Sequence, residues 1–228
     1  MAPMAEGSYF VRPTTASATS LFSDDDDIWR EADRITWGPA AYRTSFRAFW
    51  TADGLHLRFD ASDREPWSTM KERDDPLWDE EVVEIFLDLD GSGTHYAEVE
   101  LSPANVVCDV RMIQGSPDKK MDLAWELTGL STRVFPRDDG LSGLSGLSGL
   151  SGWSGILFLP WDGFASLPSA RNVSLPPERG DTWRFNVYRI ERPGGKNAPN
   201  AGAMFSAYSP TGSPSFHVPA SFQGFVFA

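Results

Sequence analysis

Apolar side chains alternate with other side chains along residues 82–89, and this period of two is the feature that most constrains the fold. The two sides consist of Val83, Ile85, Leu87 and Leu89, and of Val82, Glu84, Phe86 and Asp88. Strict alternation in a segment rich in β-branched and aromatic residues is typical of a β-strand. The segment therefore predicts a strand, with Glu84 placed among hydrophobic neighbours.

Similar runs follow one another along the rest of the chain. Residues 44–50 and 55–61 alternate and flank an Asp-Gly pair at 53–54, which is a hairpin signal. Other predicted strands cover residues 9–12, 95–101, 106–112, 121–127, 156–161, 182–192, 204–209 and 222–227. Roughly ten short strands with almost no helical periodicity predict an all-β fold, a jelly-roll-like antiparallel β-sandwich.

Three segments lie outside this pattern, within what we expect to be one domain over residues 1–228. Residues 1–8 are small and polar and predict a loose N-terminal arm. Residues 62–77 have no clear period and predict a long loop of the kind that is often functional. Residues 140–155 contain a tandem Gly-Leu-Ser repeat and predict a lengthened hairpin loop without a role in binding.

Net charge narrows the set of partners. Lys and Arg number 20 against 32 Asp and Glu, a formal charge of −12. Nucleic acids and anionic membranes attract basic surfaces, so we expect neither as a partner, and we expect a monomer. No apolar run approaches the length of a membrane span and no signal peptide is visible, so the sequence as written predicts a cytoplasmic protein, or a secreted one if it is truncated.

Metal and thiol chemistry leave few candidates. Cys108 is the only cysteine, which excludes an internal disulfide and a zinc thiolate site, and its strand-like surroundings predict a buried thiol. Four consecutive acids at 24–27 could cap a helical turn or hold a hard cation, and a solvated acidic turn is the alternative we favour. No cofactor is certain, and a structural calcium ion is the one candidate.

Trp78 and Glu84 suggest a binding function on the strand at 82–89. An aromatic ring can stack on a sugar while a carboxylate accepts hydrogen bonds from its hydroxyls. The alternative is a solvated strand face that carries a charge against aggregation.

A second alternative is an enzyme. Carboxylates such as Glu84 and Glu98, with Glu100 and Asp63 nearby in sequence, could supply the general acid and the nucleophile of a glycoside hydrolase. Spacing in the sequence does not fix their separation, and we favour a protein that is not itself an enzyme.

Several short motifs occur in the order found in family 9 carbohydrate-binding modules and their family-9-like relatives, which the chain resembles over about residues 20–228. They are the acidic turn with Ile28-Trp29, Trp50 with Asp53-Gly54-Leu55-His56-Leu57, Asp63, Trp78 with Glu84-Ile85-Phe86, Ser206–Pro210 and Phe222–Phe227. The resemblance implies a β-sandwich that binds a sugar or a glycan chain end between aromatic rings. It implies a non-catalytic role, linked to polysaccharide breakdown through glycoside hydrolase partners.

The resemblance also implies which residues bind. Trp78 would be one ring, Tyr208 would be the second ring where the family typically has Trp, and Asp63 and Glu84 would accept from hydroxyls. Glu98 and Glu100 stand where the family's sugar binders have Arg and Asn, so two donors are replaced by acids. Trp67, in the long loop, is a reserve candidate.

Overall fold

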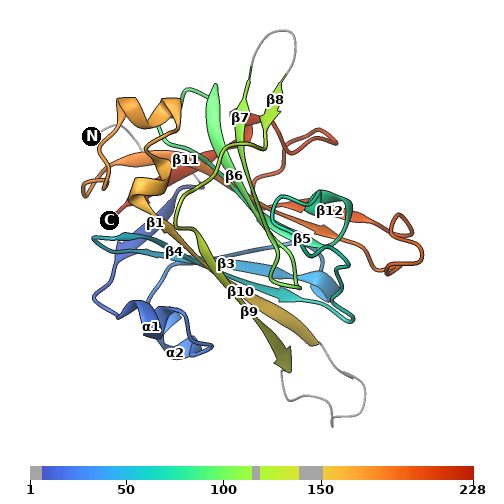
Figure 1. Cartoon of the computed structure of the whole chain (residues 1–228). Coiled ribbons are helices and arrows are strands. Elements are labelled where there is room, and N and C mark those ends of the chain that lie inside the picture. The colour runs from blue at the N-terminus through green and yellow to red at the C-terminus, as the bar shows by residue number, and fades with distance from the viewer. Residues whose placement is uncertain (1–6, 115–118, 139–150) are drawn as a thin grey trace.

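Strands dominate the part of the chain that the computed structural model describes, which is residues 7–114, 119–138 and 151–228 (Figure 1). They are β1 (Tyr9–Pro13), β2 (Arg34–Trp37), β3 (Thr44–Trp50), β4 (Gly54–Ser62), β5 (Val82–Asp88), β6 (His95–Leu101), β7 (Val107–Ile113), β8 (Lys120–Asp122), β9 (Ser131–Asp138), β10 (Ser151–Pro160), β11 (Thr182–Glu191), β12 (Met204–Ala207) and β13 (Gln223–Phe227). The helices are short: α1 (Ala18–Leu21), α2 (Asp26–Trp29) and 3-10 turns at Ala40–Tyr42, Leu77–Asp79, Trp161–Phe164, Pro168–Asn172 and Pro219–Ser221. Among the described residues, no helix is long and apolar enough to span a membrane.

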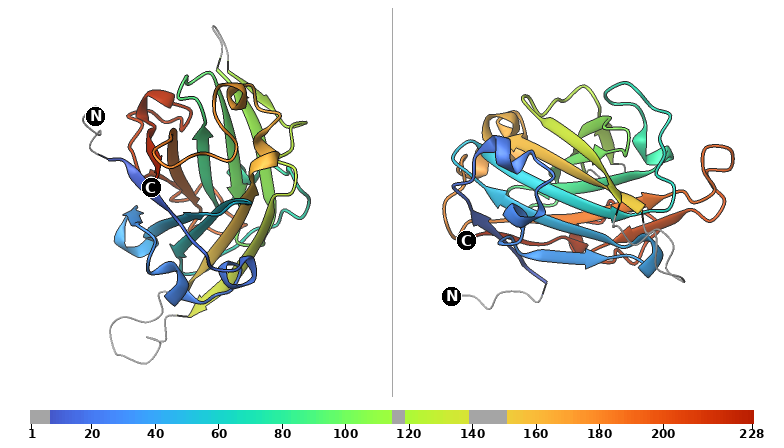
Figure 2. Two further views of the ribbon diagram at one scale, coloured as in Figure 1. Left: turned by 90° about the vertical axis from the view of Figure 1, so that its left-hand side faces the viewer. Right: turned by 90° about the horizontal axis from the view of Figure 1, so that it is seen from below.

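The strands form two layers that are continuous through β1. Neighbouring strands follow the order β8-β7-β6-β5-β11-β13-β1-β3-β4-β10-β9, with β12 beside β11 and β2 beside β3. The first half of β1 pairs with β13 and its last two residues pair with β3, so the strand passes from one layer to the other. Figure 2 shows the two layers facing each other, and we call them the β5 sheet and the β4 sheet after their central strands.

Three apolar clusters pack around these layers. The largest fills the space between the two sheets and includes Phe46, Ile85 and Trp183. A second cluster, with Phe86 and Tyr188, lies on the outer face of the β5 sheet. A third cluster lies where α1 and α2 pack on the outer face of the β4 sheet. The outer face of the β5 sheet is thus covered by loops and not by solvent alone.

Side chains along β5 point alternately to the two faces of the sheet, so this one strand contributes residues to two of these clusters. Val83, Ile85 and Leu87 point into the space between the sheets, while Val82 and Phe86 belong to the outer cluster. Every residue of β5 is buried, because the strand is central and both of its faces are covered. Glu84 lies on the outer side between Val82 and Phe86, so its carboxyl group is inside the outer cluster.

The predicted all-β sandwich is confirmed, with details that differ. Two strand pairs, β1–β13 and β1–β3, are parallel, and the other pairs are antiparallel. Thirteen strands occur in the described residues where roughly ten were expected. Residues 151–155, expected in the repeat loop, belong to β10, while residues 1–6 and 139–150 of the predicted arm and loop lie outside the described part of the chain.

The acidic run at 24–27 serves α2 and the β4 sheet. Asp25 caps α2 by accepting a hydrogen bond from the Asp27 amide. Asp26 Oδ1 lies 2.7 Å from Arg47 Nη2, and Asp24 Oδ1 lies 3.4 Å from Arg58 Nη2. Two arginines on the sheet therefore supply the positive charge that these acids attract.

Candidate functional site

A groove of about 260 Å³ opens on the outer face of the β5 sheet, and we call it the outer groove. Its walls carry aromatic rings, carboxylates and a few aliphatic groups. They comprise Trp78, Glu84, Glu98, Lys119, Met121, Ile190, Phe205, Pro214, Ser215, Phe216 and His217. These residues come from strands and loops far apart in the sequence, and the loop at 208–222 supplies one side.

Strand register brings three glutamates together beneath this groove. Glu84 on β5 pairs with Glu100 on β6, and Glu98 is two residues along β6 on the same face. One carboxylate oxygen from each lies within 4.8 Å of the others, and we call Glu84, Glu98 and Glu100 the carboxylate triad. All three side chains are buried. The alternative of a solvated acidic strand face is therefore wrong, because loops cover this side of the sheet.

Burial and mutual repulsion make the triad hard to ionise. Burial, followed by the neighbouring charge of Glu98, raises the pKa of Glu84 well above its ordinary value. The pKa of Glu100 is raised by burial and then by the charge of Glu84. Burial raises the pKa of Glu98 to about 7. Near neutral pH the triad thus holds protons and can both donate and accept hydrogen bonds.

Few partners within the described residues satisfy these carboxyl groups. Glu98 and Glu100 share a side-chain hydrogen bond with each other, and beyond the triad Glu98 Oε2 and both oxygens of Glu100 accept no hydrogen bond from a described residue. The closest basic group is the ring of His217, whose Nδ1 lies 3.9 Å from Glu98 Oε2. Burial lowers the pKa of His217 to about 4, so this ring is neutral near pH 7. A buried polar atom without a hydrogen-bond partner costs free energy. A ligand that donates hydrogen bonds to these oxygens would remove that cost.

Aromatic rings form the other surfaces of the outer groove. Phe205 and Phe216 meet edge to face with ring centroids 6.1 Å apart, and Phe216 stacks on Tyr188 at 4.4 Å. His217 stacks on Phe86 at 5.1 Å. Trp78 is half-buried and packs against the outer cluster. The groove therefore offers several ring surfaces beside a hydrogen-bonding floor.

Tyr208 does not lie in this groove, and its expected place opposite Trp78 is wrong. Phe205 on β12 pairs with Ile190, an outer-face residue, whereas the Tyr208 amide bonds to the carbonyl of Val187, an inner-face residue. The Tyr208 ring packs on Phe185 in the cluster between the sheets. Phe205, three residues earlier, is the ring that reaches the groove.

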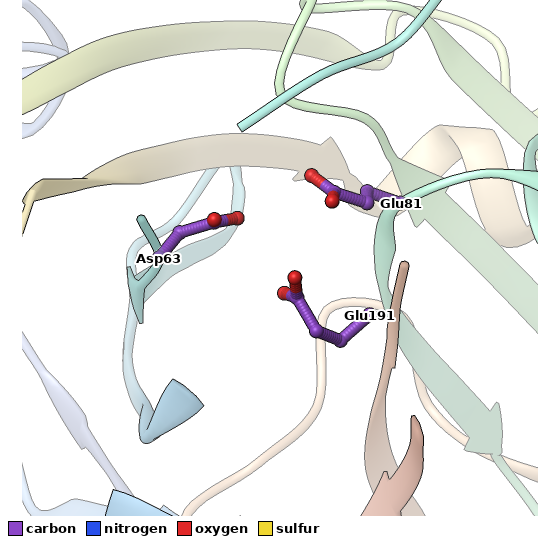
Figure 3. A group of neighbouring side chains, drawn as sticks. All are labelled: Asp63, Glu81 and Glu191. Carbon is purple, nitrogen blue, oxygen red and sulfur yellow. The ribbon is translucent and has the colours of Figure 1, made fainter. Parts of the chain in front are cut away.

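Asp63 also lies away from the outer groove, in a second group of acids. Figure 3 shows Asp63, Glu81 and Glu191 pointing toward one another; Asp63 directly follows β4, Glu81 directly precedes β5, and Glu191 is the last residue of β11. Arg189 sits among them: its Nη2 donates to Asp63 Oδ2 at 2.9 Å and to Glu191. Asp63 thus joins the two sheets through an ion pair and does not contact the groove.

Ionisation in this second group follows burial and the arginine. Burial, then the charge of Asp63, raises the pKa of Glu81 to about 9. Burial raises the pKa of Glu191 to about 7 even though Arg189 opposes the shift. Carboxylate oxygens from three residues meet here, so this group and the triad are the two places where the described residues could hold a cation. The guanidinium already balances charge in the second group, and the calcium expected from sequence remains a prediction, to be checked by a lower melting temperature in EDTA.

Trp67 likewise does not contribute to the outer groove. Its indole Nε1 donates to the Arg192 carbonyl at 3.0 Å, and its amide donates to Glu81 at 2.9 Å. Trp67 lines a separate, larger cleft of about 1070 Å³ with residues such as Pro136, Arg137 and Lys196. Of the seven residues expected to bind, only Trp78, Glu84 and Glu98 line the outer groove, with Glu100 directly beneath it.

Sequence patterns could have found some of the residues that were missed. Phe205 and Tyr208 are three positions apart on the predicted strand 204–209. Because side chains alternate along a strand, their two rings must point to opposite faces. We assigned Tyr208 to the binding site from the family motif and not from its position along the strand. Phe216, His217 and Lys119 lie in irregular segments, where the sequence has no periodic pattern that predicts the direction of a side chain.

Comparison with known proteins places this geometry in context. A model of the carbohydrate family 9 binding domain-like family matches residues 24–123, somewhat under half of the chain. The family resemblance expected from short motifs is confirmed over these residues, which include Trp78 and the whole triad. Comparison with curated proteins finds no significant match.

Solved structures extend the likeness to almost the whole chain. A candidate carbohydrate-binding protein from Bacteroides uniformis ATCC 8492 is 16% identical with a TM-score of 0.67, and the match covers 97% of this chain and 99% of that one. A family 9 carbohydrate-binding module from Caldicellulosiruptor kristjanssonii, in complex with glucose, is 13% identical with a TM-score of 0.61, over 97% and 95%. The same kind of module in complex with cellotriose gives 13% and 0.59, over 96% and 93%. The chain therefore resembles family 9 carbohydrate-binding domains in sequence over residues 24–123 and shares their β-sandwich fold over nearly its full length.

Proposed function

We propose that this protein binds carbohydrate without catalysis, and that the outer groove holds a sugar residue or a glycan chain end. The observation that carries the proposal is the meeting of aromatic rings and unsatisfied carboxyl groups in one groove. Trp78, Phe205 and Phe216 offer surfaces for the C–H faces of a sugar ring. The triad below them offers acceptors, and donors where it is protonated, for hydroxyl groups.

The comparisons support the same role. The family model covers the strand that carries Glu84, and modules with this fold have been solved with glucose and with cellotriose. Family 9 domains are binding modules, so a contribution to polysaccharide breakdown would come through partner enzymes. As the second ring beside Trp78 we propose Phe205, which lines the groove, in place of Tyr208, which does not.

Binding of this kind is expected to be of modest strength. Each stacked ring contributes roughly 1 kcal/mol, at ~25 cal/mol/Å² of apolar surface covered. Hydrogen bonds to charged groups contribute roughly 1.5–3 kcal/mol each before the cost of ordering the ligand. Together these terms give dissociation constants of roughly micromolar to millimolar, which suits a tether.

Calorimetry or tryptophan fluorescence with a panel of mono- and disaccharides tests the proposal. We expect wild type to bind at least one sugar and to release no reducing ends from oligosaccharides. Trp78→Ala should weaken binding by about tenfold or more while the melting temperature changes little, since one stacking surface is lost. Absence of binding to every sugar, or equal binding by Trp78→Ala, would contradict the proposal, and release of reducing ends would favour an enzyme instead.

A further inference from the structure

The carboxylate triad has no salt bridge to a Lys or Arg among the described residues, and this determines which sugar suits the groove. Within the described residues, no Lys or Arg forms an ion pair with Glu84, Glu98 or Glu100. Lys119 lines the mouth of the groove, where it is solvent-exposed, and its charge acts on Glu98 without forming a salt bridge. The other acid group of this protein, at Asp63, encloses the guanidinium of Arg189. Three buried acids without such a cation form a site that a cationic ligand would complete, because its charge favours their ionised form over the protonated one.

The unpartnered atoms are buried and face the groove side of the sheet. Glu98 is 3% exposed and Glu100 is fully buried, and three of their four oxygens accept no hydrogen bond from a described residue outside the triad. Glu84 and Glu98 also line the groove itself. A ligand in the groove can therefore reach the triad directly through N–H donors.

The remaining walls favour an organic ammonium over a metal ion. Calcium takes six to eight oxygen ligands, whereas the walls around the triad are the rings of Trp78, Phe205 and Phe216 together with Ile190 and Met121. Aromatic faces attract ammonium groups through cation–π contacts, and they also stack on sugar rings. An amine attached to a sugar would use both the charged floor and the apolar walls.

We propose that the outer groove selects an amino sugar, whose protonated amine sits on the Glu84, Glu98 and Glu100 carboxylates while its ring lies against the aromatic walls. This inference rests on the carbohydrate binding proposed above and narrows it to one ligand class. A neutral glucoside offers only hydroxyl donors, and an N-acetylated amine keeps an N–H group but loses the charge. The triad should therefore distinguish these three sugars.

Calorimetry near neutral pH with methyl β-D-glucosaminide, methyl β-D-glucoside and methyl N-acetyl-β-D-glucosaminide tests this choice. We expect the glucosaminide to bind about tenfold or more tightly than either neutral sugar, because charge-assisted hydrogen bonds replace neutral ones. Glu98→Gln, which keeps the shape of the side chain, should bring the ratio of the affinities toward one. Lys119→Met should raise that ratio, because it removes a positive charge from the mouth of the groove.

The outcomes separate this inference from the proposal on which it rests. If none of the sugars in the wider panel binds, carbohydrate binding itself is refuted. If neutral sugars bind and the glucosaminide gains nothing over them, only the amino-sugar inference is refuted. Glucosaminide binding that disappears in EDTA and returns with CaCl₂ would assign the triad to a divalent cation and would also overturn the inference. The wild-type comparison suffices even if Glu98→Gln fails to fold.

Discussion

Phe205 is the most exposed of the large apolar side chains in the described part of the chain, at 55%, and it contacts few groups that a fold requires. Its ring lies beside the Phe216 ring, and the Arg192 guanidinium sits 5.3 Å from its centroid. A side chain this exposed adds little to folding stability. Its position on the groove wall instead suits contact with a ligand.

Replacement of Phe205 by alanine should therefore separate binding from folding. We expect Phe205→Ala to weaken sugar binding by about tenfold, since one stacking surface is removed, and to leave the melting temperature nearly unchanged. Calorimetry and thermal denaturation measure the two effects. Leu123→Ala is the matched control, because Leu123 is 42% exposed but does not line the groove. Equal affinities in wild type and Phe205→Ala would remove Phe205 from the site.

Tyr208 provides the complementary test on the other face of the sheet. Its hydroxyl donates to the Gly7 carbonyl and its ring packs on Phe185, so it serves the interior. We expect Tyr208→Leu, which removes the aromatic ring, to bind sugar as wild type does, with affinity measured by the same titration. A tenfold loss in this variant would restore the original assignment of Tyr208 as a binding ring.

Most of the strands were predicted from the sequence, and the strands that were missed show the limits of such a prediction. β3, β4, β6 and β11 begin and end within one or two residues of the predicted runs, because each alternates strongly. β2 and β9 were not predicted, since Arg34–Trp37 is short and Ser131–Asp138 contains a proline and two arginines. Alternation of apolar and polar side chains indicates a strand that has one apolar face. These two strands lie at edges of the sheet order.

The candidate site was harder to predict because its contacts join distant elements. Glu84, Glu98 and Trp78 were found through one strand and its neighbour, which the hairpin register brings together. The role of Asp63 depends on Arg189, which lies 126 positions later in the chain. A carboxylate near a strand end looks the same in sequence whether it faces a ligand or an arginine. Only the packing of the two sheets separates these cases.

Arg189 connects the two sheets, and its loss should be costly. It extends from β11 in the β5 sheet and donates to Asp63 and to the Ser62 carbonyl at the end of β4, and it is 1% exposed. We expect Arg189→Met to lower the unfolding free energy by roughly 3–5 kcal/mol, because it leaves buried acids without their cation. Urea denaturation measures this change.

An exposed ion pair gives the control for Arg189. Arg12 Nη2 lies 2.8 Å from Asp33 Oδ1, and the Arg12 side chain is 56% exposed. Arg12→Met should cost less than about 1 kcal/mol, because water and ions screen a surface pair. If both variants lose the same stability, the bridge between the sheets does not have the role assigned to it here.

At the scale of the whole molecule, buried acids govern how stability depends on pH. Burial raises the pKa of Glu81 to about 9 and the pKa values of Glu98 and Glu191 to about 7, against an ordinary value of 4.5. At any pH between the ordinary pKa and the raised pKa of such a group, the folded state binds more protons than the unfolded state. The free energy of unfolding therefore falls as pH rises from about 5 to about 9.

Urea denaturation at about pH 5, 7 and 9 checks this dependence. We expect the midpoint concentration to decrease at each step, and Glu81→Gln should reduce the decrease between the last two, since that carboxyl no longer has to lose its proton. Asp60 acts only at lower pH, because its pKa is lowered to about 2 by Arg58 and other cations against the opposing effect of burial. A midpoint that rises from pH 5 to pH 9 would show that these acids are not buried as described.

The position of β13 has a consequence for how the molecule forms during synthesis. Its five residues lie between β11 and β1, so they are the only strand that joins the two halves of the sheet order given for the described residues. A nascent chain that has not yet emerged past residue 222 carries two unjoined edges, on β11 and on β1, and open edges of this kind recruit other strands. Completion of the fold must wait for residues 223–227 to leave the ribosome, which makes the pairing of β13 the step at which assembly and aggregation compete.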